Sequence, residues 1–223
     1  MKRIISYMLI VFVLAAGMAA CGKTNKGKMS NEWKVTSMES KETYENSTGS
    51  KTVSTFTMTE STITETNYYE YVPGPPAYTE IETSEVNANE FIINKDGTWS
   101  WVIDATQTTS NGTHQEILEQ AGTWSFLDRT KGDDFKKNER VLFNVLTLKA
   151  RNIVIENGIT VDDFTDNLTY TTGKSTMIYT VIESKKDKLE LEMDAENVTT
   201  TNSNMSSGMN ANTSYRKITL EAR

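Results

Sequence analysis

Few residues of this sequence have the types and spacing that catalysis requires. His114 is the only histidine, and its polar surroundings from Ser110 to Gln115 predict an exposed loop rather than a positioned general base. The chain has neither a Gly-x-Ser-x-Gly nucleophile motif nor a phosphate-binding glycine loop. Zinc usually takes several Cys or His ligands, and the sequence has one of each. We therefore expect no catalytic residue, no metal and no cofactor, and hence a protein that is not an enzyme.

A short acidic segment is a second candidate for chemistry. Asp162, Asp163, Asp166 and Asn167 supply oxygen ligands of the kind that calcium prefers. Their spacing does not match that of an EF-hand loop, and an acidic turn is usually solvated. We interpret this segment as a turn on the surface.

Aromatic side chains are the strongest candidates for binding. The four tryptophans all fall in segments expected to be strands: Trp33, Trp99, Trp101 and Trp124. In such positions they either fill a β core or line an interior that takes a small apolar ligand. The run Tyr68 to Tyr71 stands close to Pro73. Because tyrosine is enriched at interfaces, this run is a candidate contact surface for another protein.

The lone cysteine marks the amino-terminal segment as an export and anchoring signal. A basic start is followed by an apolar run from Ile4 to Ala16, which is too short to span a bilayer and has the parts of a secretory signal peptide. The run leads into Met18-Ala19-Ala20-Cys21, which resembles the lipobox of bacterial lipoproteins. A single cysteine cannot form an internal disulfide. We expect removal of residues 1–20 as a signal peptide, and acylation of Cys21 that palmitate would label.

Charge and composition indicate where the mature chain resides and what it contacts. The 223 residues include 23 Lys+Arg and 30 Asp+Glu, and this acidic balance disfavours nucleic acid as a partner. Residues 21–30 are small, polar and basic and predict a lipidated tether, which leaves residues 31–223 as one β domain. Cys21 is not followed by Asp or by an acidic run. This pattern favours the outer membrane, with the domain facing the periplasm.

The clearest predicted element is a β-hairpin over Glu90–Asp104. A three-residue loop, Lys95 to Gly97, pairs Ile93 with Trp99 and gives the more apolar face of the two possible registers. That face carries Phe91, Ile93, Trp99, Trp101 and Ile103. We therefore expect Trp99 and Trp101 to face an interior.

Alternating apolar and polar residues predict further strands, and hence an all-β, antiparallel fold. The expected segments are 33–35, 53–58, 141–149, 153–156, 176–183, 188–194 and 214–221. Val141–Lys149 also fits helical spacing, and Gln115–Gln120 is the best candidate for a helix. Gly122-Thr123-Trp124 repeats the pattern at Gly97 and predicts a second strand entered through a glycine turn. Asn67–Thr79, which holds all three prolines, and Asn197–Thr213 are expected to be loops.

Taken with the lipobox and the early strand at Trp33, two motifs resemble the lipocalin-like lipoproteins of Bacteroidota. One is Phe91 to Thr98, which fits that group's Phe-x-x-x-x-Asp-Gly-Thr hairpin, and the other is Gly122-Thr123-Trp124. The resemblance runs over residues 31–223 in strand order. It implies an antiparallel meander that closes into a barrel of about eight strands. It also implies a membrane-anchored, non-enzymatic envelope protein that binds a small apolar ligand or, alternatively, docks on another envelope protein through the aromatic loop.

Overall fold

The computed structural model describes residues 25–46, 49–127, 139–196 and 210–223. The predicted signal peptide, Cys21 and most of the loop 197–213 lie outside these residues. Among those described, no helix is both long and apolar enough to cross a membrane.

One antiparallel sheet of 11 strands contains most of the described chain, which confirms the predicted all-β class. A single helical turn, α2 (Asn25–Met29), precedes it. The strands are β1 (Asn31–Glu45), β2 (Lys51–Thr59), β3 (Thr62–Glu70), β4 (Tyr78–Ile93), β5 (Thr98–Thr108), β6 (Gly112–Leu127), β7 (Arg140–Glu156), β8 (Ile159–Thr169), β9 (Thr176–Ser184), β10 (Lys188–Glu196) and β11 (Asn210–Ala222).

Part of the sheet closes into a barrel-like ring. β4 pairs with β1 as well as with β5, and β7 pairs with β9 as well as with β6. The hydrogen-bonded order β1, β4, β5, β6, β7, β9, β10, β11 therefore returns to β1. The ring has eight strands, which agrees with the predicted barrel of about eight. The remaining strands, β2, β3 and β8, extend the sheet beyond the ring to 11 strands.

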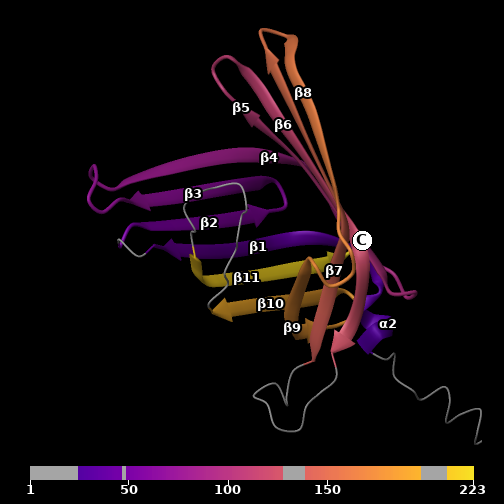
Figure 1. Ribbon diagram of the computed structural model, residues 1–223. Coiled ribbons are helices and arrows are strands. Elements are labelled where there is room, and N and C mark those ends of the chain that lie inside the picture. Colours follow the sequence, from indigo (N-terminus) through magenta and orange to yellow (C-terminus); the bar gives the residue numbers. More distant parts are fainter. Residues whose placement is uncertain (1–24, 47–48, 128–138, 197–209) are drawn as a thin grey trace, which may run out of the picture.

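Beyond the ring the sheet divides into two arms that diverge (Figure 1). The first arm consists of β2 and β3 with residues 37–45 of β1 and 78–85 of β4. The second arm consists of β8 with the outer parts of β5, β6 and β7. β4 joins the two arms, because it pairs with β3 up to Glu85 and with β5 from Glu85 onward.

Large side chains fill the interior of the ring. Trp99 packs edge to face on Phe143 with ring centroids 5.3 Å apart, and Phe91 does the same on Trp101 at 5.4 Å. Further buried side chains come from β1, β9, β10 and β11, among them Trp33, Val35, Tyr179, Leu189, Leu191, Ile218 and Leu220. Burial of each such residue contributes roughly 1.5–3 kcal/mol, so this packed interior is the main source of stability.

Residues that precede the first strand also pack on the ring. Met29 of α2 is fully buried, and its carbonyl accepts a hydrogen bond from the indole Nε1 of Trp33 at 2.8 Å. The segment 21–30 was predicted as a tether, but its last residues pack on the ring. Residues 21–24 lie outside the described chain.

The predicted register of the hairpin is confirmed. Ile93 pairs with Trp99, and the Asn94 amide donates a hydrogen bond to the Thr98 carbonyl at 2.9 Å. Gly97 has a φ of 94°, the left-handed conformation that a three-residue loop needs at this position. The hairpin joining β9 and β10 is also confirmed.

Two local predictions are wrong, and two predicted strands are one. Gln115–Gln120 is not a helix but part of β6. The predicted strands 141–149 and 153–156 are both confirmed as strand, but they form a single element, β7. β5 and β7 flank β6 on both sides, and this pairing overrides weak helical spacing. Gly122 does not open a strand, because it lies within β6 at a β-bulge against β7.

Candidate functional site

The four tryptophans predicted to line an interior are all buried, with exposed fractions between 0% and 5%. Each indole nitrogen donates a hydrogen bond within the fold. Trp99 donates to the Asn144 carbonyl, Trp124 to the Asn94 carbonyl and Trp101 to Asn89 Oδ1, at 2.8–3.0 Å. Trp33, Trp99 and Trp124 therefore belong to the packed interior, while Trp101 also borders the cavity described next.

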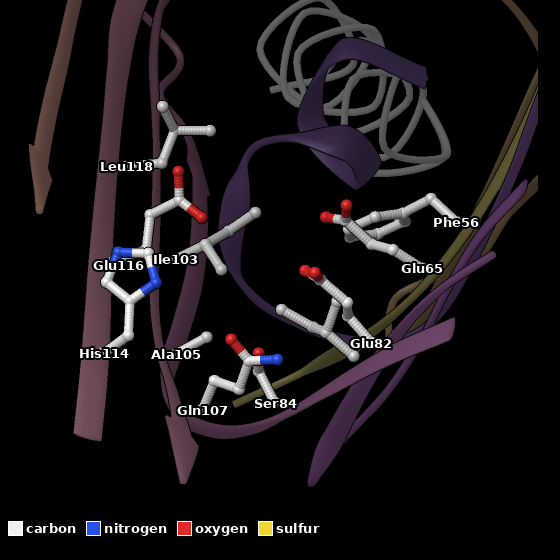
Figure 2. A pocket seen from close by; sticks show the side chains of 11 residues that line it. Phe56, Glu65, Glu82, Ser84, Ile103, Ala105, Gln107, His114, Glu116 and Leu118 are labelled. Atoms are coloured by element: carbon white, nitrogen blue, oxygen red, sulfur yellow. The ribbon is translucent and has the colours of Figure 1, made fainter. Parts of the chain in front are cut away.

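A cleft separates the two arms where they leave the ring. It comprises two adjoining cavities of about 250 and 310 Å³ that share Phe56, Glu65, Ile103 and Leu118. One wall belongs to β1–β4 of the first arm, and the other to β5 and β6 of the second arm (Figure 2). Strand alternation explains the lining, because every second residue of these strands points to the inner face.

The inner end of the cleft is apolar. Ile63 comes from the first arm, and Trp101, Ile103 and Leu118 come from the second. Phe56 continues this apolar surface outward on the first arm, directly opposite Glu65 across the β2–β3 pair. Ile103 lies directly opposite Leu118 across the β5–β6 pair, so these two side chains form one continuous surface. This part of the cleft can hold an apolar group of small size.

Two polar atoms at the same end have no hydrogen-bond partner among the described residues. They are Gln120 Oε1 and Arg216 Nε, both fully buried and both on residues that line the cleft. A buried polar atom without a partner costs roughly 1–3 kcal/mol. Because neither atom is exposed, this cost is part of the free energy of the fold.

Carboxylates face one another further out. Glu65 and Glu82 lie directly opposite each other across the β3–β4 pair, and Glu116 extends from β6 on the other wall (Figure 2). Glu65 is open to the solvent of the cleft, yet partial burial and then the charges of Glu116 and Glu82 raise its pKa. Like charges directly opposite across a strand pair destabilise a sheet. The arrangement therefore favours a bound cation between the arms.

His114 was predicted to lie in an exposed loop, and this prediction is wrong. It is in β6, opposite Gln107 of β5, and its half-buried ring lines the cleft beside Glu116 (Figure 2). The segment is polar because it forms a wall of an open cleft. Its alternating pattern, with His114, Glu116 and Leu118 on one face, was the signal that would have identified it.

The acidic segment 162–167 is not a turn but part of β8, so its side chains point to alternate faces. Asp163 is bound by Arg151, whose Nη2 lies 2.7 Å from Asp163 Oδ2, and this hydrogen bond lowers the pKa of Asp163. Among the described residues, no group of three or more His, Cys, Asp or Glu side chains is placed to hold a metal ion. That finding applies to the carboxylates of the cleft as well.

The predicted aromatic contact surface lies at the tip of the first arm. β3 extends to Glu70 and β4 begins at Tyr78, so the loop is shorter than expected. Tyr69 and Tyr78 face each other across the strand pair with ring centroids 5.0 Å apart, and Tyr71 stacks on Tyr69 at 6.4 Å. Tyr71 and Tyr78 are 41% and 43% exposed. We call these three residues the tyrosine platform.

Comparisons of the chain with protein-family models, with curated proteins and with solved structures find no match.

Proposed function

We propose that this chain is a lipid-anchored, non-enzymatic envelope protein that binds a small amphipathic cation between its two arms. The observation that supports the proposal is the cleft, in which an apolar inner end is followed by three facing carboxylates. The expectation of a small apolar ligand is thus refined. An apolar body would lie on Phe56, Ile103 and Leu118, and a positively charged group would lie among the glutamates.

The chemistry of the walls favours an organic cation over a metal ion. The carboxylates of Glu65, Glu82 and Glu116 come from both arms and, within the described chain, do not form a metal-binding group. An ammonium group carries donors that can bridge such separated acceptors. Partial burial is the main reason why the pKa of Glu65 is raised, and the charges of Glu116 and Glu82 add to it; the positive charge of the ligand would offset this second contribution.

The anchor and location in this proposal rest on the sequence. The signal peptide, residues 1–20, and the lipobox ending at Cys21 support a membrane attachment through acyl chains, in the outer membrane facing the periplasm. Replacement of Cys21 by Ser should abolish labelling with palmitate and release the protein or leave it unprocessed. Labelling that persists in Cys21→Ser would contradict the anchor.

Titration calorimetry with hexylammonium and hexanoate tests the cleft. The two probes share one apolar chain and differ in the sign of the charge. We expect hexylammonium to bind and hexanoate not to bind, because the carboxylates attract one and repel the other. Glu65→Gln combined with Glu82→Gln should weaken hexylammonium binding. The control Glu39→Gln, on an exposed residue of β1 outside the cleft, should not.

The tyrosine platform supports a second candidate function, which is docking on another envelope protein. Its rings are stacked, rigid and exposed at the end of an arm, and tyrosine suits such contacts. A photocrosslinker at Tyr71 should then give one discrete adduct in intact cells. The same crosslinker at Glu39 should give none.

A further inference from the structure

The end of the molecule opposite the arms has a basic surface. We call it the base and define it as α2, the β9–β10 turn at residues 185–187, and the carboxyl-terminal residues Ala222 and Arg223. These segments meet around a cavity of about 480 Å³, whose charged lining consists of Lys28, Lys186 and Arg223 together with one acidic residue, Asp187. Figure 1 shows α2 and the carboxyl terminus at this end, away from the free ends of both arms.

Two lysines of the base are free to bind an anion. Lys28 and Lys186 form no ion pair with a carboxylate anywhere in the described chain. By contrast, Arg223 is paired with Glu90 at 2.7 Å. Lys26, on the same helical turn as Lys28, extends over the ring of Trp124 at 5.7 Å. Lys185, at the same turn as Lys186, is paired with Glu183. Lys28 and Lys186 are therefore the two cations of the base that could pair with an anion from outside the chain.

The position of Cys21 brings this surface close to a membrane. Cys21 is four residues from Asn25, the first residue of α2. Four extended residues span at most about 14 Å. The Debye length at physiological salt is about 8 Å, so a base held this near the bilayer comes within the range of its surface charge.

The rest of the molecule is acidic, and this difference in charge would orient the molecule on an anionic membrane. The whole chain has a formal charge of −7, and the walls of the cleft carry Glu65, Glu82 and Glu116. A bilayer with anionic headgroups would attract the base and repel the arms. We infer that the base docks on anionic lipid headgroups, and that this contact directs the cleft away from the membrane. The inference rests on the proposed anchor for proximity, while the charge pattern is independent of it.

A tethered vesicle assay tests this contact without requiring acylation. The chain from Gly22 onward retains every described residue, and an amino-terminal oligohistidine tag on nickel-chelating lipid replaces the acyl anchor. Tethering raises the effective concentration, so that a weak second contact becomes measurable as slower dissociation. The lipids are phosphatidylcholine, with or without phosphatidylglycerol.

Phosphatidylglycerol should slow dissociation of the unsubstituted chain, and added salt should remove the effect. Each lysine near an anionic surface accounts for about a fivefold change in affinity. Lys28→Ala with Lys186→Ala should therefore lose most of the slowing. The control, Lys41→Ala with Lys51→Ala, changes the net charge equally on the first arm and should retain it.

Two results would overturn the inference. One is dissociation that is equally fast from neutral and anionic vesicles. The other is an equal loss in the base variant and the arm variant, which would show a response to net charge alone. Neither result bears on the anchor, which palmitate labelling of Cys21 tests separately.

Discussion

At the scale of single residues, the molecule separates aromatic side chains that build the fold from polar ones that remain available for binding. Trp99 has its indole nitrogen bonded to the Asn144 carbonyl at 3.0 Å and is 2% exposed. The inner face of the arms instead carries Glu65, Glu82 and Glu116, which are open to the cleft. Burial and hydrogen bonding thus distinguish structural from functional candidates more clearly than residue type does.

Truncation of Trp99 should destabilise the protein severely. Trp99→Ala leaves a cavity beside Phe91 and Phe143, and truncation of a core tryptophan costs about 3–5 kcal/mol. Ser100 points to the other face, so Ser100→Ala should change the free energy of unfolding by no more than about 0.5 kcal/mol. Urea unfolding of both variants measures the difference. Equal, small effects would show that Trp99 does not face the interior.

Glu65→Gln should stabilise the folded protein at neutral pH. The pKa of Glu65 is raised above its ordinary value of 4.5, so the folded state binds this proton more readily than the unfolded state. Its charge therefore opposes folding once the pH exceeds the raised pKa. The gain from Glu65→Gln should vanish as the pH falls below 4.5, where the carboxyl is protonated in both states. Thermal unfolding across this range measures the gain, and a pH-independent difference would contradict the raised pKa of Glu65.

Glu183 provides a control of opposite sign. Hydrogen bonds from Lys185 and Lys188 lower its pKa to about 2. Its charge stabilises the folded state at neutral pH, and this stability is lost as the pH falls from the ordinary value of 4.5 towards 2. Glu183→Gln should therefore destabilise at neutral pH and have little effect in acid. Melting temperatures that rise in Glu183→Gln at neutral pH would be inconsistent with this ion pair.

At the scale of elements, the sequence predicts strands that alternate clearly between apolar and polar residues and misses strands that are mostly polar and exposed on both faces, such as β8. The hairpin around Gly97 was predicted to the residue, because its loop and its apolar face agree. Gln115–Gln120 was predicted as a helix, but it belongs to one wall of the cleft. The segment is polar because it borders the cleft, and the sequence alone does not show the opposite wall. A mostly polar sequence is weak evidence for a strand when the sequence does not show which side chains face the strand across a cleft.

Gly122 shows how close contact between strands fixes a residue type. A Cβ at this position would lie 1.8 Å from the carbonyl oxygen of Asn144, which belongs to the backbone of β7 and cannot move aside freely. Gly122→Ala should therefore destabilise by at least the roughly 1–3 kcal/mol typical of overpacking. Ser125→Ala, on an exposed residue of the same strand, should be near neutral. Denaturant midpoints compare the two, and a neutral Gly122→Ala would argue against the bulge.

At the scale of the whole molecule, the cleft arises from the way one strand joins two arms. The class of fold and many of the strands were predictable from local pattern. The cleft was not, because Glu65 and Glu116 are 51 positions apart and meet only when β4 changes partner at Glu85. The tryptophans were predictable as buried residues, but the sequence does not show which of them borders a cavity. The ligand-binding role proposed for all four remains a prediction, and the geometry supports it best at Trp101.

Methyl-labelled protein titrated with hexylammonium and observed by NMR tests the central claim most directly. The cleft contains the methyl groups of Ile63, Ile103 and Leu118, whereas Ile218 and Leu220 lie in the packed ring. We expect saturable shifts at the first three residues and unchanged signals from the other two. Shifts confined to exposed methyl groups outside the cleft, such as those of Ile81 and Ile159, or no saturable shift at all, would contradict binding between the arms.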